Sequence, residues 1–130
     1  MTRISVVTAV YNNRETIAAA LDSALGQAGA ELELIVIDGG STDGTLDILK
    51  SYANRLDVLV SEPDRGIYDA LNKGIRLASG DVIGFLHSDD LFADAKALSR
   101  VAAAFADARV GAVYGDLLYV RKDDPDSVVR

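Results

Sequence analysis

The segment LELIVIDGGSTDGT (residues 32–45) joins an apolar run to a polar, glycine-rich turn. The run at residues 32–37 is rich in Leu, Ile and Val, which predicts a strand covered on both faces, as in a parallel sheet. The turn at residues 38–44 follows directly, and its glycines permit a tight change of direction. This order is typical of the strand ends of open α/β sheets, where ligands bind.

Three further apolar runs, at residues 4–9, 58–61 and 82–86, predict strands of the same kind. Helical patterns separate the strands, with apolar periods at residues 17–25 and 98–105. The clearest helical stripe consists of Ile67, Ala70, Leu71, Gly74, Ile75 and Ala78. Alternating strands and helices predict right-handed βαβ units, and therefore a three-layer α/β/α sandwich with a mostly parallel sheet.

The pattern changes after residue 105. Residues 111–114 and 117–121 look like strands, residues 122–126 like a turn, and residues 127–130 like the start of a returning strand. We therefore expect the α/β fold to end in a partial β-hairpin. The length of 130 residues is that of a single domain.

Composition restricts the partners of the chain. Its formal net charge of −7 argues against nucleic acid, because phosphate backbones require clustered Lys and Arg. It contains no cysteine and one histidine, His87, so any metal ion must be held mainly by oxygen, which favours Mg²⁺ or Mn²⁺. No apolar run approaches the roughly 18 residues that span a bilayer, and no signal peptide is visible. We expect a cytoplasmic protein, with peripheral contact at the inner membrane face left open.

Polar side chains follow each of the four predicted strands, at residues 11–13, 38–44, 62–66 and 87–90. Because the carboxyl ends of parallel strands meet at one edge of a sheet, we expect these side chains to gather there. The sequence has no G-x-G-x-x-G after its first strand and no P-loop, so neither of those phosphate-binding designs is supported. The first strand also ends without an Asp, which argues against an aspartyl-phosphate intermediate.

Several of these polar residues also have a purely structural interpretation. Asn12 or Asn13 can cap the first helix, and Ser41 or Asp43 can cap the second, by satisfying free backbone N–H groups. A single histidine such as His87 is more often structural than a ligand.

Asp89 and Asp90 are harder to explain in this way. Adjacent carboxylates after a buried strand repel each other and lose solvation, which is costly unless a cation, a cap or water relieves it. Asp90 can cap a helix that starts near Ala93, which leaves Asp89 to bind a metal ion.

Taken together, these residues predict a site for a phosphorylated ligand. We expect Tyr11, Asn12 and Asp38 to meet a base or sugar, and a metal on Asp89 to hold a diphosphate. Additional positive charge is expected from Arg65 and Lys73.

Four segments resemble the successive motifs of the family-2 glycosyltransferases of the GT-A fold. They are VVTAVYN (6–12), VIDGGSTDGT (36–45), EPDRGIYDALNKG (62–74) and GDVIGFLHSDD (80–90). The resemblance covers roughly residues 3 to 92, and four motifs in the right order make it specific. It implies a Rossmann-like half-domain that binds the nucleotide of a uridine-type sugar donor.

The resemblance also implies individual roles. Thr8 and Tyr11 are expected to line the base pocket, with Tyr11 against the uracil ring, and Asp38 to accept a hydrogen bond from the uracil N–H. The segment from Asp64 to Asn72 is expected to close around the base and ribose. The full set of expected nucleotide contacts is Thr8, Ala9, Tyr11, Asn12, Asp38, Gly39, Ser41, Asp64, Arg65, Asn72, Lys73, His87 and Ser88.

Asp89 matches the last acid of the family's D-x-D metal motif and is expected to bind Mn²⁺ or Mg²⁺ at the diphosphate. His87 stands where that motif usually has its first acid, so the ribose contact there is a histidine hydrogen bond or is missing. The family's acceptor-binding half and its general base lie further along the chain. We therefore expect a truncated domain, with the base beyond Arg130; Asp116 follows a predicted strand but matches no motif.

The function that the resemblance implies is that of a hexosyltransferase. It would move a sugar from a UDP-sugar to a hydroxyl of a glycan or lipid-linked acceptor, with inversion and a metal ion, in polysaccharide, glycolipid or cell-envelope glycan biosynthesis. The alternative is a non-catalytic module that binds a nucleotide or nucleotide sugar. Apolar surface left by a missing half would favour self-association, so a homo-oligomer stays open.

Overall fold

The computed structural model describes residues 2–107, 109, 119–121 and 124–129. In chain order its elements are β1 (Arg3–Val10), α1 (Ile17–Leu25), β2 (Glu31–Asp38), α2 (Thr45–Ser51), the 3₁₀ turn η1 (Ala53–Arg55), β3 (Val58–Ser61), α3 (Ile67–Leu77), β4 (Val82–Phe85), α4 (Ala97–Phe105), β5 (Tyr119–Arg121) and β6 (Asp124–Val129). No described helix has the length and apolar character needed to cross a membrane.

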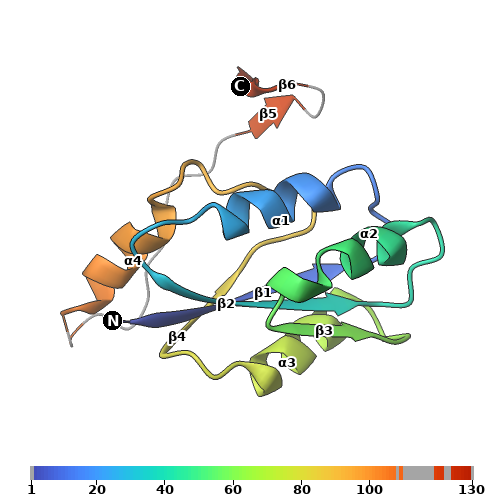
Figure 1. Ribbon diagram of the computed structural model, residues 1–130, viewed down its shortest axis with the longest axis horizontal. Helices are drawn as coiled ribbons and strands as arrows, with labels where there is room; N and C mark the ends of the chain where they lie inside the picture. Colours follow the sequence, from blue (N-terminus) through green and yellow to red (C-terminus); the bar gives the residue numbers. More distant parts are fainter. Residues whose placement is uncertain (1, 108, 110–118, 122–123, 130) are drawn as a thin grey trace.

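The first four strands form one parallel sheet in the order β3-β2-β1-β4. The chain runs outward from β1 to β3 and then returns across the sheet to β4, on the other side of β1. Figure 1 shows α1 and α2 on one face of the sheet and α3 on the opposite face. The predicted three-layer α/β/α arrangement is therefore confirmed.

Two apolar layers hold the helices to the sheet. On one face, Val6 of β1 belongs to a cluster that includes Leu21 of α1 and Leu49 of α2. On the other face, Val7 of β1 belongs to a cluster that includes Ala70 of α3. Successive residues of β1 thus face opposite layers, which explains why the strand is apolar almost throughout.

Helix α3 rests on the sheet along a narrower line than its apolar stripe predicts. Ala70 and Gly74 are buried, whereas Ile67 and Ile75 are 47% and 40% exposed. A β-carbon at position 74 would lie 2.2 Å from Cγ1 of Val7, so glycine is what allows the helix to approach β1 this closely. The close approach is centred on Gly74, and the flanks of the stripe remain accessible among the described residues.

Strand β4 is also less covered than expected. Ile83 and Phe85 pair in register with Ser5 and Val7 of β1 and so lie on the α3 face of the sheet. They are 41% and 48% exposed within the part of the chain that the structure describes. The expectation of cover on both faces holds for the central strand β1 and fails for this face of β4.

Two predicted boundaries are wrong. The helix expected near Ala93 begins at Ala97, because the Asp94 carboxylate accepts the backbone N–H of Lys96 in a turn that comes first. The turn predicted for residues 122–126 extends too far, since β6 already starts at Asp124, where it pairs with Arg121 in an antiparallel hairpin. An Asp-Pro-Asp sequence favours a turn, but an edge strand also tolerates proline.

Several predicted features fall on residues outside those described. They are the strand at residues 111–114, the start of the strand at 117–118, the first turn positions 122–123, Asp116 and Arg130.

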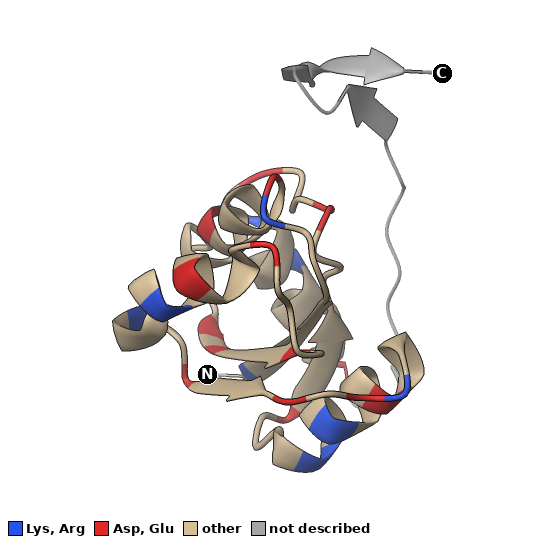
Figure 2. Ribbon diagram, turned by 90° about the vertical axis from the view of Figure 1, so that its right-hand side faces the viewer, with Lys and Arg blue, Asp and Glu red and all other residues tan. Residues whose placement is uncertain are grey.

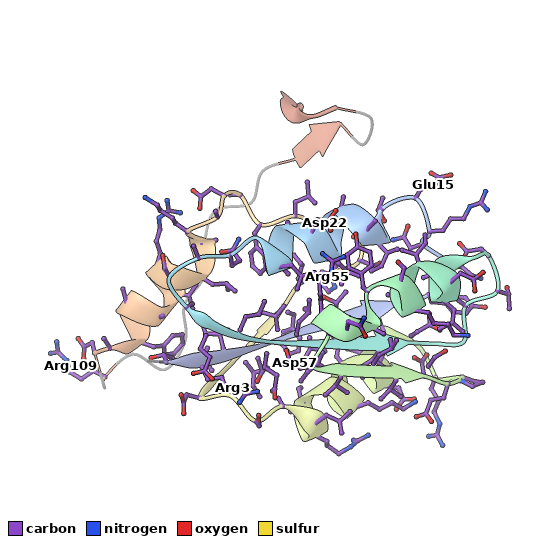
Figure 3. All side chains as sticks on the ribbon, viewed as in Figure 1. Arg3, Glu15, Asp22, Arg55, Asp57 and Arg109 are labelled. Atoms are coloured by element: carbon purple, nitrogen blue, oxygen red, sulfur yellow. The ribbon has the colours of Figure 1, made fainter. Side chains whose placement is uncertain are left out.

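A buried carboxylate joins three segments near the amino ends of the strands. Glu33 is 5% exposed and accepts hydrogen bonds from the Ser5 hydroxyl (2.7 Å), from the backbone N–H (2.8 Å) and hydroxyl (2.6 Å) of Ser79, and from Arg3 (3.0 Å). Arg3 is labelled in Figure 3. Burial of the Glu33 carboxyl opposes its ionisation, but the Ser5 and Ser79 hydrogen bonds and the Arg3 charge outweigh burial and lower its pKa to about 2.

The Gly74 contact leads to a stability prediction. Gly74→Ala should destabilise the fold by about 1–3 kcal/mol, because the new methyl group overlaps Val7. Helix propensity alone predicts the opposite sign, a gain of up to about 1 kcal/mol. Urea unfolding of both proteins measures the difference. The matched control is Gly84→Ala, because a β-carbon at position 84 meets no described atom within 4 Å; a stabilised Gly74→Ala protein would contradict the proposed close packing.

The Glu33 network leads to a pH prediction. The pKa of the Glu33 carboxyl is about 2 in the folded protein, against an ordinary value of 4.5. Ionised Glu33 should therefore contribute roughly 3 kcal/mol above pH 4.5, and this contribution should be lost as the pH falls from 4.5 towards 2. In Glu33→Gln, unfolding free energy should be lower at pH 7 and depend less on pH in that window.

Glu31→Gln provides the control for this measurement. The Glu31 carboxylate lies 3.9 Å from the Arg3 guanidinium, and the Glu31 side chain is 51% exposed. Loss of this carboxylate should therefore change the free energy of unfolding little. Parallel pH curves for wild type and Glu33→Gln between pH 2 and 5 would show that Glu33 does not titrate as described.

Candidate functional site

The loops that follow the four parallel strands lie together at one edge of the sheet, as expected. Backbone hydrogen bonds extend the sheet just past the strand ends and so bring the loops into register: Gly39 N–H to Val10 C=O (2.9 Å), Glu62 N–H to Asp38 C=O (3.0 Å) and Leu86 N–H to Val7 C=O (3.1 Å). Figure 2 views the molecule from the right-hand side of Figure 1 and shows Asp and Glu residues in several loops.

Asp38, at the end of β2, is fully buried and accepts hydrogen bonds from its own loop and from Ser61 at the end of β3. Its Oδ2 atom accepts the N–H groups of Gly40 (3.2 Å) and Ser41 (3.1 Å) and the hydroxyl of Ser61 (2.7 Å), while Oδ1 accepts the hydroxyl of Ser41. These donors satisfy the buried carboxylate oxygens from within the protein. Oδ1 accepts a single hydrogen bond from the described residues and has capacity for a second, but Asp38 is fully buried in this structure, and its assignment to the base stays a prediction.

The loop after β1 is tied to the loop after β2 by two groups of hydrogen bonds, one around Asn12 and one around Asp43. In the first group, the Asn12 N–H donates to the hydroxyl oxygen of Ser41 (2.8 Å), and the Asn12 side-chain oxygen accepts the N–H of Thr42 (2.7 Å). Asn12 has φ 46°, in the left-handed region that Asn adopts more readily than most residues. Its side chain therefore clamps the two loops and does not cap α1.

The second group involves Asp43 and the buried residue Thr45. The Asp43 carboxylate accepts the N–H (3.0 Å) and hydroxyl (2.6 Å) of Thr45 and the N–H of Arg14 (3.3 Å). The Thr45 hydroxyl oxygen also accepts the N–H of Asn13 (3.0 Å). The Thr45 hydroxyl bond is the main reason that the pKa of Asp43 is lowered. Asp43 thus satisfies the first N–H of α2, as the capping interpretation predicts, and also binds the neighbouring loop.

The loop after β1 also binds the loop after β4. The side-chain N–H of Asn13 donates to the hydroxyl oxygen of Ser88 (2.8 Å), and the hydroxyl of Thr16 donates to the backbone carbonyl of Ser88 (2.9 Å). The Asn13 side chain therefore does not cap α1; only its carbonyl accepts helix N–H groups, from Thr16 and Ile17. The capping interpretation of Asn12 and Asn13 is wrong.

Asp64 lies against the turn after β2. Its Oδ2 atom is 2.9 Å from the place that a β-carbon of Gly39 would occupy, and Oδ1 accepts the N–H of Gly66 (2.9 Å). Gly39 therefore makes room for the carboxylate of a neighbouring loop. The structure brings together these two predicted site residues, which lie 25 positions apart in the sequence.

The two predicted cationic residues have different surroundings. Lys73 Nζ lies 3.0 Å from Glu62 and 3.7 Å from Asp69, and its side chain is 17% exposed. The Glu62 hydrogen bond is the main reason that the pKa of Lys73 is raised. Arg65 is exposed, and its backbone N–H donates to Asp69 (3.0 Å). Lys73 is thus already paired with acids, whereas the Arg65 guanidinium has no salt-bridge partner among the described residues.

Four further residues that are predicted to contact the nucleotide differ in their exposure to solvent. Tyr11 is 62% exposed, and Asn72 on α3 is also exposed. Thr8 and Ala9 are buried, and the Thr8 hydroxyl has no hydrogen-bond partner among the described residues. Tyr11 is therefore open to a ligand in this structure, whereas Thr8 is covered; the predicted contacts of both with a base stay predictions.

Asp89 is free in the sense that a metal ligand requires. His87, Asp89 and Asp90 are all exposed, and no described residue donates a hydrogen bond to the Asp89 carboxylate. The Asp90 N–H donates to the carbonyl of His87 (3.0 Å) in a turn, and Asp90 does not cap α4, which begins at Ala97. The proposed relief of Asp90 by a helix N-terminus is wrong; exposure to solvent relieves the pair instead.

A hard divalent ion at Asp89 requires further oxygen ligands from a bound molecule and from water. Within the described residues, no three His, Cys, Asp or Glu side chains are arranged to hold a metal ion. One exposed carboxylate supplies too few of the six or more oxygen ligands that Mg²⁺ and similar ions take, so phosphate oxygens and water would have to complete the shell.

Sequence reasoning missed the residues that connect the loops. Thr16, Thr45 and Ser61 were not expected at the site, although their hydroxyls hold Ser88, Asp43 and Asp38 in place. The available signal was the placement of short hydroxyl side chains at the start of a helix or the end of a strand. Their partners lie 72, 2 and 23 residues away, and local patterns reveal only the second of these.

Comparisons with known proteins agree with this fold. The chain is 38% identical over 118 residues to the PGL/p-HBAD biosynthesis glycosyltransferase of Mycobacterium tuberculosis, a match that covers 88% of this chain and 46% of that protein. Among solved structures it resembles the mannosyltransferase PcManGT from Pyrobaculum calidifontis in complex with GDP-Man and Mn²⁺, with 32% identity and a TM-score of 0.77. That match covers 85% of this chain and 34% of the other.

A second solved structure is that of S. aureus TarS 1–349 in complex with UDP-GlcNAc, with 31% identity and a TM-score of 0.73 over 81% of this chain and 31% of the other. The chain spans about half the length of the mycobacterial relative. The family description "Glycosyl transferase family 2" matches residues 5–128. Because this match takes in nearly the whole sequence, the chain belongs to glycosyl transferase family 2.

Proposed function

We propose that this chain is the donor-binding half of a metal-dependent glycosyltransferase that uses a UDP-sugar. The observation that carries the proposal is the position of Tyr11 and Asp89. Both are exposed, and they follow the adjacent strands β1 and β4, between which the chain reverses its direction across the sheet. Ligands of open α/β sheets bind at this point, outside the carboxyl ends of the strands.

The aromatic and acidic residues suit different parts of a nucleotide sugar. The exposed ring of Tyr11 offers a stacking surface for a base, and His87 and Asn72 offer polar groups for the ribose. The similar protein TarS is solved with UDP-GlcNAc and PcManGT with GDP-Man, which supports a nucleotide-sugar donor. The choice of uridine rests on the resemblance of the motifs around Tyr11 and Asp38.

A divalent ion resolves the charge problem of this site. The chain carries a net charge of −7, and Lys73 is already paired with Glu62 and Asp69, which leaves Arg65 as the predicted site cation without a salt-bridge partner among the described residues. We propose that Asp89 binds Mn²⁺ or Mg²⁺ together with the diphosphate oxygens, and the Mn²⁺ in the PcManGT structure supports this choice. When bound, such an ion neutralises the charge that develops on the departing diphosphate.

The proposed reaction is direct displacement of the nucleotide at the anomeric carbon by a hydroxyl of a glycan or lipid-linked acceptor, with inversion. In it, this chain orients the donor: Tyr11 holds the base, and Asp89 fixes the diphosphate end, so that the leaving group is positioned. Removal of the acceptor proton requires a general base. We assign that role to none of the described residues.

The metal proposal predicts a specific loss in one variant. UDP binding by the wild type should be strengthened by Mn²⁺, and Asp89→Asn should lose most of this strengthening, because an amide oxygen is a weaker ligand without charge. Binding without metal should change little. Isothermal titration calorimetry with UDP, with and without MnCl₂, measures both quantities.

Asp90→Asn is the matched control, since it removes the neighbouring exposed carboxylate and should retain most of the Mn²⁺ effect. Equal UDP affinities of the wild type with and without Mn²⁺ would contradict the metal proposal. An identical loss in both variants would show that general negative charge, and not a ligand at position 89, attracts the ion.

The base-stacking proposal predicts the complementary behaviour. Tyr11→Ala should weaken UDP binding by about 1–3 kcal/mol, to the same extent with and without Mn²⁺, because stacking on the base does not involve the metal. Tyr11→Phe should bind nearly as well as the wild type because it keeps the ring. The same calorimetric titrations test this, and unchanged affinity in Tyr11→Ala would place the base elsewhere.

A further inference from the structure

Ser88 is held from both of its sides by residues of the preceding β1–α1 connection. The Thr16 hydroxyl donates to its carbonyl (2.9 Å), and the Asn13 amide donates to its hydroxyl (2.8 Å). Both donors lie more than 70 residues earlier in the sequence. Ser88 is the residue directly before Asp89, so these bonds act on the main chain that carries the proposed metal ligand.

Few other hydrogen bonds restrain residues 87–90. The sheet ladder ends with the Leu86 N–H to Val7 C=O bond, and among the described residues the other backbone–backbone bond of residues 86–90 is the turn between Asp90 N–H and the His87 carbonyl. The Asp89 side chain has no donor among the described residues. The main chain is anchored on either side of Asp89 by Leu86, which is buried in the core, and by Phe92, which packs on the core and donates its N–H to Ser23. Between these anchors, the two bonds to Ser88 are the hydrogen bonds that tie the segment to another loop.

The Thr16 hydroxyl does not cap its own helix and instead binds the loop after β4. Thr16 is the N-cap residue of α1, where a threonine side chain ordinarily accepts a helix N–H, yet it makes no such bond here. The side chain of Asn13 likewise leaves the helix uncapped and binds Ser88. Two side chains at one helix start thus favour a contact with the β4 loop over local helix capping.

We propose that Thr16 and Asn13 are positioning residues for the metal ion. They hold the main chain at Ser88 so that the Asp89 carboxylate is presented in one place before the ion and diphosphate arrive. The inference rests on the proposed function, since it requires a metal at Asp89. Neither residue is expected to touch the ion or the nucleotide.

Positioning of this kind has a limited but measurable effect. A mobile ligand must be ordered when the ion binds, and this ordering weakens binding. Removing one supporting hydrogen bond should reduce the Mn²⁺ enhancement of UDP affinity by about three- to tenfold, the range that one net hydrogen bond corresponds to. UDP affinity without metal should change less than about twofold, because Tyr11 and the β2 loop are held by separate bonds.

The experiment compares Thr16→Val with Thr16→Ser. Valine keeps the branched shape without the hydroxyl, while serine keeps the hydroxyl that donates to Ser88. UDP titrations by calorimetry, with and without MnCl₂, should show a reduced Mn²⁺ enhancement in Thr16→Val and its recovery in Thr16→Ser. Asn13→Ala is a second test, because it removes the amide and leaves the backbone N–H that binds Thr45.

The outcomes separate this inference from the proposed function. A wild type whose UDP affinity does not respond to Mn²⁺ overturns the proposed function and this inference with it. A wild type that responds, with full enhancement in both Thr16→Val and Asn13→Ala, overturns the inference alone. Equal losses with and without Mn²⁺, or no recovery in Thr16→Ser, also overturn it, because they indicate a general structural role.

Discussion

The hydrogen bonds of the β1–α1 connection to its two neighbours are what the rest of the site depends on. β1 is the strand from which the chain first moves to β2 and to which it later returns with β4. Its following loop therefore lies between the other two, and Asn12 and Asn13 bind the β2 loop while Asn13 and Thr16 bind the β4 loop. The topology of the sheet thus determines which loops can be joined.

The carboxylates of this acidic chain fall into two groups, those that accept hydrogen bonds from the protein itself and those that are exposed to solvent. Glu33 accepts hydrogen bonds from Ser5, Ser79 and Arg3. Asp38 accepts four, from Gly40, Ser41 and Ser61. Asp43 accepts hydrogen bonds from Thr45 and Arg14. These carboxylates stabilise the fold. Asp89 is exposed and has no described donor, so its charge is available to a cation.

Local patterns in the sequence predicted most of the fold, because the alternation of apolar strands with periodic helices leaves few ways to bury both faces of a sheet. They failed where packing is decided by distant residues. The apolar stripe of α3 includes Ile67 and Ile75, yet the helix rests on β1 where Gly74 meets Val7. The start of α4 was misplaced because the Asp94 side chain forms a turn before the helix.

The sequence by itself determined the α/β class, the four polar strand ends and the identity of the family, since these depend on residue types and spacings within short segments. Only the tertiary structure decided which of these polar groups form hydrogen bonds within the protein and which are exposed to solvent. Asp38 ends one apolar strand and Asp89 follows another; the glycine-serine turn after Asp38 supplies three of its four hydrogen bonds, but the fourth, from Ser61, comes from a strand 23 residues away. The difference arises because Ser61 and the β2 turn surround Asp38 with donors, while Asp89 lies beyond the reach of any described donor.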